Sequence, residues 1–418
     1  MKLTYKKLYR LLCLQIFFLW NIFPLNYIDQ VDDLLYRSVY MPQKSEKKTA
    51  VVLVHHDAPH WGGMESHMVN YYKTLLKHGH SVVLITKTGT ETARQLDCMK
   101  LPFMPFSKNG LYQDMLDACR AIDANVIVCL SFEKVGVAKL VAKTMPIKII
   151  YEQHMVSYAQ QSGSVTMLKG IDAVVAVNQE LVNHFEKINQ HDTLDIKHIK
   201  FIPPFMDEDR FSLPLPKISK DKYFKKNFNI GLKQCPTLCM IAGMYPSVDG
   251  KNHPLLFKAI HHFVHIKKRP VQALLVGDGA AKEYLKKLVH KLKINEYIHF
   301  LGFTPPSQIP AILHYADFHV LASTKESFGL VHIEAGFMKK PSIGALGTGA
   351  TTIIKHGVSG LLFKNNNLKS LINCIDQLAH RPVLCAKFGK NAFEYMHKYF
   401  SNDIHYQLLT DLYKKIGC

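Results

Sequence analysis

The chain has 418 residues, enough for two domains that each bury a core of their own. Its 48% hydrophobic and 20% charged residues are ordinary for a globular protein. The formal net charge of +19 favours anionic partners, such as acidic membranes, nucleic acids or phosphorylated substrates, or else a solvated lysine-rich surface. No arginine-rich arm, RRM-type aromatic motif or zinc-finger spacing occurs, so nucleic acid is the disfavoured partner.

The nine cysteines are scattered along the chain. Only Cys235 and Cys239 lie close together, and no second pair or histidine spacing completes a zinc site around them. Most of the others fall in apolar segments. We therefore expect buried thiols in a reducing compartment.

Residues 1–48 differ from the rest of the chain. Four basic residues within the first ten precede an apolar run at 11–25, and no small-residue cleavage site follows. The run is shorter than the roughly 20 apolar residues that span a bilayer, and it contains Gln15, Asn21 and Pro24. An uncleaved anchor, an interfacial helix and an ordinary packed helix remain open interpretations. We expect a membrane-associating segment followed by a polar connector.

The sequence pattern of residues 49–205 predicts a first α/β domain. Continuous apolar runs alternate there with helix-like spacers, which indicates a parallel sheet covered on both faces. The runs begin at Val51, Val82, Val126, Ile147, Ala173 and Ile199. Ligands of such sheets bind beyond the carboxyl ends of the strands.

Three residues of this domain follow predicted strands. Gly62 and Gly63 come just beyond the first strand, where the backbone can approach a phosphate closely, although a glycine pair is also typical of any turn. His154 follows the strand that ends at Tyr151. It is either a substrate contact or an ordinary loop histidine.

A proline-rich stretch predicts a linker at 206–229, and a second α/β domain follows at 230–385. Its predicted strands begin near Pro236, Val271, Ile298, Ala316 and Pro341, and a turn and strand follow at 356–363. Lys251 stands just before a predicted helix, where its ammonium can reach a phosphate in the crevice or remain solvated. Residues 386–418 predict helices.

The stretch from Ser323 to Gly336 organises the second domain. A strand ends in a polar turn that carries Glu326, and a helix with an apolar face follows and carries Glu334 on its second turn. The free backbone N–H groups at the start of that helix, near residues 328–330, form an anion site. A loop carboxylate, an amide cradle and a helix carboxylate then surround one crevice. This layout suits a diphosphate flanked by hydroxyl-rich sugars.

The assembled order resembles the retaining glycosyltransferases of family 4, which have the GT-B fold of two Rossmann-like domains facing a cleft. The resemblance extends from about Val51 to the C-terminus, and its most specific part is the segment 326–336, with two glutamates separated by seven residues. Supporting matches are Val276-Gly-Asp-Gly279, Phe300-Leu-Gly302, His356-Gly-Val-Ser-Gly-Leu-Leu-Phe363, Gly62-Gly63 and the turn at Lys251.

The resemblance implies roles for these residues. Glu334 would hold the ribose hydroxyls of a UDP- or GDP-sugar, and Glu326 and His154 would contact the donor sugar as catalytic residues. Lys251 and the amides of Phe328, Gly329 and Leu330 would bind the diphosphate, with Gly62 and Gly63 approaching from the first domain. The helices at 386–418 would cross back onto the first domain. No permanently bound cofactor and no metal are required.

The implied function is transfer of a sugar, with retention, from a nucleoside diphosphate sugar to an envelope glycolipid or polysaccharide. Lipopolysaccharide or polysaccharide synthesis would be the setting. The catalytic domains would lie on the cytoplasmic side, at an anionic membrane surface.

One departure from the family pattern is that Met244 follows Gly243, where many family members have arginine. Lys251 would then hold the phosphates with Asn252 or His253 nearby. This departure keeps a catalytically degenerate, membrane-tethered scaffold that binds sugar nucleotides as the alternative. A nucleic-acid-modifying enzyme is the weakest hypothesis, because only the net charge suggests it.

Overall fold

The computed structural model describes residues 49–55, 62–107, 110–154, 165–191, 194–206, 208–246 and 250–418. The apolar helix expected within residues 1–48 lies outside these ranges. Within them, no helix is both long and apolar enough to cross a membrane.

The first domain is built on a seven-stranded, wholly parallel sheet with the order β3-β2-β1-β4-β5-β6-β7. Its strands are β1 (Ala50–Val54), β2 (Ser81–Thr86), β3 (Met104–Pro105), β4 (Val126–Cys129), β5 (Lys148–Gln153), β6 (Ala173–Ala176) and β7 (His198–Phe201). Its helices are α3 (Gly63–Lys77), α4 (Glu91–Cys98), α5 (Leu111–Ile122), α6 (Phe132–Ala142), the 3₁₀ turn η2 (Val165–Leu168) and α8 (Gln179–His191). The central strands are buried along their whole length, as expected for a sheet covered on both faces.

The second domain repeats this plan with six parallel strands in the order β10-β9-β8-β11-β12-β13. They are β8 (Thr237–Ile241), β9 (Gln272–Val276), β10 (Ile298–Gly302), β11 (Phe318–Val320), β12 (Ser342–Ala345) and β13 (Gly360–Phe363). The main helices are α9 (Lys220–Phe228), α10 (His253–His261), α11 (Lys282–Lys291), α12 (Ile309–Tyr315), α13 (Leu330–Phe337), α14 (Ala350–Ile353) and α15 (Leu368–Ala379). Short turns are η3 (Asp209–Ser212), η4 (His262–Ile266), η5 (Asn295–Tyr297) and η6 (Pro306–Gln308).

Both sheets reverse their strand order beside the first strand of the domain. The reversal falls between β1 and β4 in the first sheet and between β8 and β11 in the second. Ligands of doubly wound sheets bind at such switch points, beyond the carboxyl ends of the strands. The expectation of two Rossmann-like parallel-sheet domains is therefore confirmed, and the topology selects the loops after β1 and β8 for the site.

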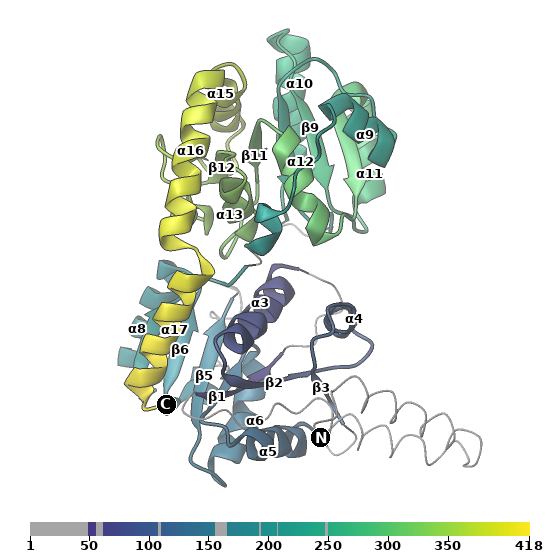
Figure 1. Cartoon of the computed structure of the whole chain (residues 1–418). Coiled ribbons are helices and arrows are strands. Elements are labelled where there is room, and N and C mark those ends of the chain that lie inside the picture. Colours follow the sequence, from purple (N-terminus) through teal and green to yellow (C-terminus); the bar gives the residue numbers. More distant parts are fainter. Residues whose placement is uncertain are drawn as a thin grey trace, which may run out of the picture.

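The last two helices lie against different domains (Figure 1). Helix α16 (Pro382–Tyr399) packs on α13 of the second domain, and α17 (Asn402–Ile416) reaches α3 of the first. The hydroxyl groups of Tyr413 and Tyr71 are 2.8 Å apart in this buried contact. The C-terminal segment therefore fastens the two domains together on one side.

The domains also share a hydrophobic cluster. Phe328, just before α13, and Ile333 and Phe337 within it belong to the same buried cluster as residues of the first sheet, together with Met396 and Phe400. Burial of apolar surface stabilises the folded state by about 25 cal/mol per Å². The glutamate-bearing segment is thus held by both domains rather than by its own sheet alone.

Candidate active site

A cavity of about 500 Å³ lies between the two domains. Residues from the first domain that line it are Gly62, Gly63 and Ser66, and the segment between the domains contributes Arg210. The second domain contributes chiefly Gly243, Tyr245, Lys251, Asp278, Gly279, Phe303, Thr304, Leu330, Val331 and Glu334. The cavity therefore brings together five of the residues predicted from sequence: Gly62, Gly63, Lys251, Leu330 and Glu334.

Two helices begin at this cavity, one from each domain. Gly63 is the first residue of α3 and Leu330 is the first residue of α13. A Cβ atom built on Gly63 would lie 3.5 Å from Cδ1 of Leu330, so the two helix starts touch across the domain boundary. Helix N-termini carry unpaired N–H groups and a partial positive charge. Together they make this end of the cavity an anion-binding region.

Lys251 pairs with Glu326 across the loops of the second domain. The Nζ atom of Lys251 lies 2.5 Å from Oε2 of Glu326, and the Ser323 hydroxyl is 3.3 Å from the same oxygen. The Lys251 side chain is 36% exposed, whereas that of Glu326 is 15% exposed. Lys251 thus has room to turn toward a ligand in the cavity, while Glu326 is held in place.

Arg210 pairs with Glu334 in the same cavity. The guanidinium Nη2 donates to Oε1 of Glu334, and both side chains are largely buried. The sequence did not single out Arg210, because it stands among acidic residues in a segment predicted to be an interdomain linker. Among the described residues, the cavity is therefore lined by one complete cation–carboxylate pair, Arg210–Glu334, and by Lys251, whose partner Glu326 lies outside the lining.

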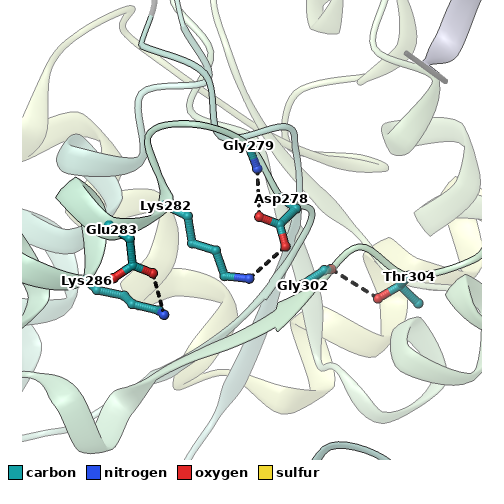
Figure 2. A network of polar contacts seen from close by, with 7 residues as sticks. All are labelled: Asp278, Gly279, Lys282, Glu283, Lys286, Gly302 and Thr304. Atoms are coloured by element: carbon teal, nitrogen blue, oxygen red, sulfur yellow. Dashed lines mark hydrogen bonds and ion pairs between the residues drawn. The ribbon is translucent and has the colours of Figure 1, made fainter. Parts of the chain in front are cut away.

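The turn after β9 contributes a carboxylate whose charge is already compensated (Figure 2). Asp278 accepts hydrogen bonds from Lys282 Nζ at 2.7 Å and from the Gly279 amide at 2.9 Å. The hydrogen bond from Lys282 lowers the pKa of Asp278 below its ordinary value. The neighbouring Gly302 carbonyl accepts from the Gly277 amide at 2.9 Å and from the Thr304 hydroxyl. The backbone of this turn therefore lines the cavity, and the Asp278 carboxylate adds little net negative charge there.

Met244 does not face the cavity. Its side chain is 1% exposed and belongs to the hydrophobic core of the second domain, while its backbone bonds to Asp278 and Ala281. Neither Asn252 nor His253 lines the cavity. His253 is buried, and burial together with Lys251 lowers the pKa of His253 to about 4, so it supplies no positive charge at neutral pH. Arg210, rather than either neighbour of Lys251, is the second cation of the site.

Phe328 and Gly329 lie beside the cavity rather than in its lining. Phe328 is buried in the cluster shared by the domains, and Gly329 caps α13 with a left-handed backbone at φ 93°. A Cβ atom on Gly349 would lie 2.4 Å from Cα of Phe328, so the glycine turn after β12 supports this loop from behind. Of the three residues predicted to cradle the diphosphate, Leu330 lines the cavity, and Val331 adds to it.

His154 lies at the end of β5 in a buried group with Glu152 and His67. The Nε2 atoms of His154 and His67 are 3.1 Å and 2.8 Å from Oε1 of Glu152. Burial alone would raise the pKa of Glu152, but the two imidazoles hold it well below its usual range. His154 does not line the 500 Å³ cavity, although it acts electrostatically on Glu65, whose carboxylate accepts from the Gly62 amide at 2.7 Å.

The same three side chains are the one group of potential metal ligands within the described residues, with ligand atoms within 4.8 Å of one another. The amide of Phe205, however, donates to Nδ1 of His67 at 2.7 Å. Because Nδ1 accepts this hydrogen bond, it carries no proton, and the ring proton is on Nε2, the atom that faces Glu152. A metal would need the lone pair of that nitrogen. The arrangement therefore favours a histidine that directs this proton to Glu152 over a metal centre.

Another cavity, of about 780 Å³, opens at the amino ends of β8, β11 and β12 and is lined by several lysines, among them Lys220 and Lys340. Ligands of doubly wound sheets bind at the opposite, carboxyl ends. The smaller cavity between the domains is therefore the better candidate for an active site.

Residues 236–395 match the family model described as Glycosyl transferases group 1. The chain carries a group 1 glycosyltransferase domain. This glycosyltransferase domain contains every described residue of the cavity except Gly62, Gly63, Ser66 and Arg210. The match confirms the predicted resemblance to glycosyltransferases over these residues.

Curated relatives resemble parts of the chain. One is the N-acetyl-alpha-D-glucosaminyl L-malate synthase of Bacillus anthracis, 32% identical over 33% of this chain and 38% of the relative. Another is the D-inositol 3-phosphate glycosyltransferase of Corynebacterium kroppenstedtii, 25% identical over 54% of this chain and 49% of the relative. The chain thus spans less than half the length of either.

Solved structures match over both domains. HepE from Anabaena, crystallised with UDP and glucose, superposes with a TM-score of 0.73 at 18% identity, covering 88% of this chain and all of HepE. A glycosyltransferase from Rickettsia africae gives a TM-score of 0.74 at 22% identity, covering 88% of this chain and 99% of that one. These matches establish that the glycosyltransferase domain is part of a GT-B fold.

Proposed function

We propose that this protein transfers a hexose, with retention of anomeric configuration, from a UDP- or GDP-sugar to an envelope glycolipid or polysaccharide. The observation that carries the proposal is the meeting of two helix N-termini, one from each domain, with Lys251 at a single cavity of about 500 Å³. A departing diphosphate needs preorganised dipoles and a cation in a closed site. The UDP complex of HepE and the sugar-transferring relatives support a nucleotide donor.

The residues take distinct roles in this proposal. Glu334 on α13 accepts hydrogen bonds from the ribose hydroxyls, and Lys251 exchanges Glu326 for the diphosphate. The released Glu326 then accepts from a hydroxyl of the donor sugar. His154 lies outside the cavity lining and acts electrostatically on Glu65 near the start of α3, and the family resemblance assigns it the contact with the donor sugar on the side of the first domain. Neither glutamate is required as acid or nucleophile, which distinguishes this chemistry from glycoside hydrolysis.

The basic, apolar N-terminal region and the net charge of +19 support a membrane-associated enzyme whose catalytic domains face the cytoplasm and whose acceptor is at an anionic membrane surface. Flotation of the full chain with vesicles containing anionic lipid tests this part. We expect the protein to float with vesicles that contain anionic lipid more than with neutral vesicles. Failure to float with either anionic or neutral vesicles would contradict the membrane association without touching the donor site.

Thermal unfolding of the full chain with UDP, GDP, ADP and CMP tests the donor site. A ligand at 100 times its dissociation constant stabilises the native state by about 2.7 kcal/mol. We expect one of UDP or GDP to raise the unfolding temperature, Glu334→Ala to reduce the shift, and Glu283→Ala, an exposed change on α11, to preserve it. A stable protein that no nucleoside diphosphate shifts would overturn the proposal. Once an acceptor is found, the anomeric configuration of the product by NMR tests retention.

A further inference from the structure

Arg210 lies in the segment that joins the two domains, the predicted linker at 206–229, which is called the connector below. This connector brings Arg210 to the donor site. The η3 turn places Phe211 against Phe337 of α13, with the rings stacked at 5.7 Å. Phe337 and Glu334 are three residues apart on α13, so they lie on the same side of the helix. The same contact that docks the connector on α13 therefore brings the Arg210 guanidinium to Glu334.

The contact leaves one carboxylate oxygen of Glu334 available. Arg210 Nη2 donates to Oε1, and no residue that the structure describes is bonded to Oε2. Both side chains line the cavity, while Arg210 is only 7% exposed and lies over the ring of Phe211 at 4.8 Å. A guanidinium that is buried and stacked in this way holds one oxygen of a carboxylate more firmly than a flexible ammonium does.

We propose that Arg210 is a positioning residue: it holds Oε1 of Glu334 so that Oε2 faces the cavity and accepts the ribose hydroxyls of the nucleotide. This inference rests on the proposed function, because it takes Glu334 to be the ribose-binding carboxylate. It adds that the nucleotide site is incomplete without the connector. The specificity for a ribose diol then depends on a residue outside the glycosyltransferase domain.

Calorimetric titration with UDP and 2′,3′-dideoxy-UDP, and with the corresponding GDP pair, tests the proposal on the full chain. The wild type is expected to prefer the ribose form roughly tenfold, since hydrogen bonds to a charged group are among the stronger ones. Arg210→Gln should reduce this preference several-fold while changing the affinity for the dideoxy form less than about twofold. Arg210→Lys should restore part of it.

The double variant Arg210→Gln/Glu334→Ala decides whether Arg210 acts through Glu334. If it does, the double variant binds as Glu334→Ala alone. The inference would be overturned if Arg210→Gln lost affinity equally for the ribose and dideoxy forms, or if the losses of affinity added up in the double variant. Either result would leave the proposed function standing. A wild type that binds neither UDP nor GDP would overturn both. Arg269→Gln, a change at an exposed arginine of the second domain, is the control and should behave as wild type.

Discussion

Asn178 donates a hydrogen bond of 2.5 Å to the carbonyl oxygen of Ser327, so the end of strand β6 in the first domain holds the loop that carries Glu326 in the second. The other side of the same amide accepts from the Leu181 amide at 2.8 Å and caps α8. One side chain thus links a helix start in the first domain to the glutamate loop across the cleft.

The two functions of Asn178 can be separated by substitution. Asn178→Asp keeps the oxygen that caps α8, but it replaces the amide donor with an oxygen that repels the Ser327 carbonyl. The cap is kept, since Asp caps helices as well as Asn does, but Asn178 is buried, so the lost hydrogen bond and the repulsion should also lower the free energy of unfolding by about 1 kcal/mol or more. Nucleotide affinity should fall about three- to tenfold, corresponding to roughly 1 kcal/mol for a lost hydrogen bond. Thermal unfolding without ligand and titration with the bound nucleotide measure the two effects.

Asn178→Ala is the companion variant, because it removes the cap as well. It should lose about 1 kcal/mol of stability in addition to the loss of affinity. If Asn178→Asp binds nucleotide as tightly as wild type, the contact with Ser327 does not contribute to the site.

Gly349 supports the same loop by its lack of a side chain. Its φ of −53° suits any residue, but a Cβ atom would lie 2.4 Å from Cα of Phe328. Gly349→Ala should therefore push the glutamate loop away and cost stability and nucleotide affinity together, by about 1–3 kcal/mol for an overpacked contact. Denaturant unfolding and nucleotide titration check this.

Gly347 provides the control for Gly349. It lies in the same turn with a φ of 74°, and nothing is within 4 Å of the position of its Cβ atom. Gly347→Ala should cost about 1–2 kcal/mol of backbone strain without displacing the loop. Stability should fall while nucleotide affinity is preserved. Equal behaviour of the two variants would contradict the steric argument.

The architecture could be predicted from the sequence because buried parallel strands are continuous apolar runs. The runs beginning at Val51 and Val126 became β1 and β4, which are buried throughout. The two-residue strand β3 was missed, because Met104–Pro105 is too short to show a pattern. Glycines and carboxylates after strands were found for the same reason, since topology sends those positions to one edge of the sheet.

The parts of the site that sequence could not predict depend on contacts between distant segments. Arg210 stands in a charged, proline-rich stretch that is typical of a solvated linker, and only the packing of Phe211 on Phe337 brings it to the cavity. Met244 was interpreted as a missing cation, yet its side chain is in the core. Asn178 offered a usable signal, a polar residue just beyond a buried strand, that the sequence interpretation did not use.

Lys251 is expected to contribute to diphosphate binding and not to nucleoside binding. Lys251→Met keeps the apolar stem and removes the ammonium, which now pairs with Glu326 at 2.5 Å. Affinity for the nucleoside diphosphate should fall about 10- to 100-fold, the range for a hydrogen bond between charged groups, while that for the nucleoside stays within about twofold. Titration with UDP and uridine, or GDP and guanosine, measures the difference.

The control for Lys251 is Lys258→Met, which removes an exposed ammonium from helix α10. It changes the net charge equally, so a general electrostatic attraction of the nucleotide would lower affinity in both variants. A loss confined to Lys251→Met supports a direct contact. Parallel loss of uridine and UDP binding in that variant would instead indicate local unfolding.

His405 on α17 should make the protein sensitive to acid. The side chain is fully buried beside Phe205, and neither ring nitrogen has a hydrogen-bond partner among the described residues. Burial lowers the pKa of His405 to about 3 from an ordinary value of 6.5. The unfolded chain therefore takes up a proton below pH 6.5 that the folded chain does not, and the free energy of unfolding decreases as the pH falls from about 6.5 toward 3.

His405→Leu should raise stability at neutral pH by about 1 kcal/mol, because it replaces a buried polar ring without partners by an apolar group of similar size. Relative to wild type, the gain should grow by about 2 kcal/mol between pH 7 and pH 4.5, since the variant has no proton to gain at this position. Urea unfolding across that pH range measures both the gain in stability at neutral pH and its increase toward pH 4.5. His290→Leu, a change at an exposed histidine of α11, should keep the wild-type pH dependence. A gain in His405→Leu that does not vary with pH would show that the ring is protonated, or hydrated, in the folded protein.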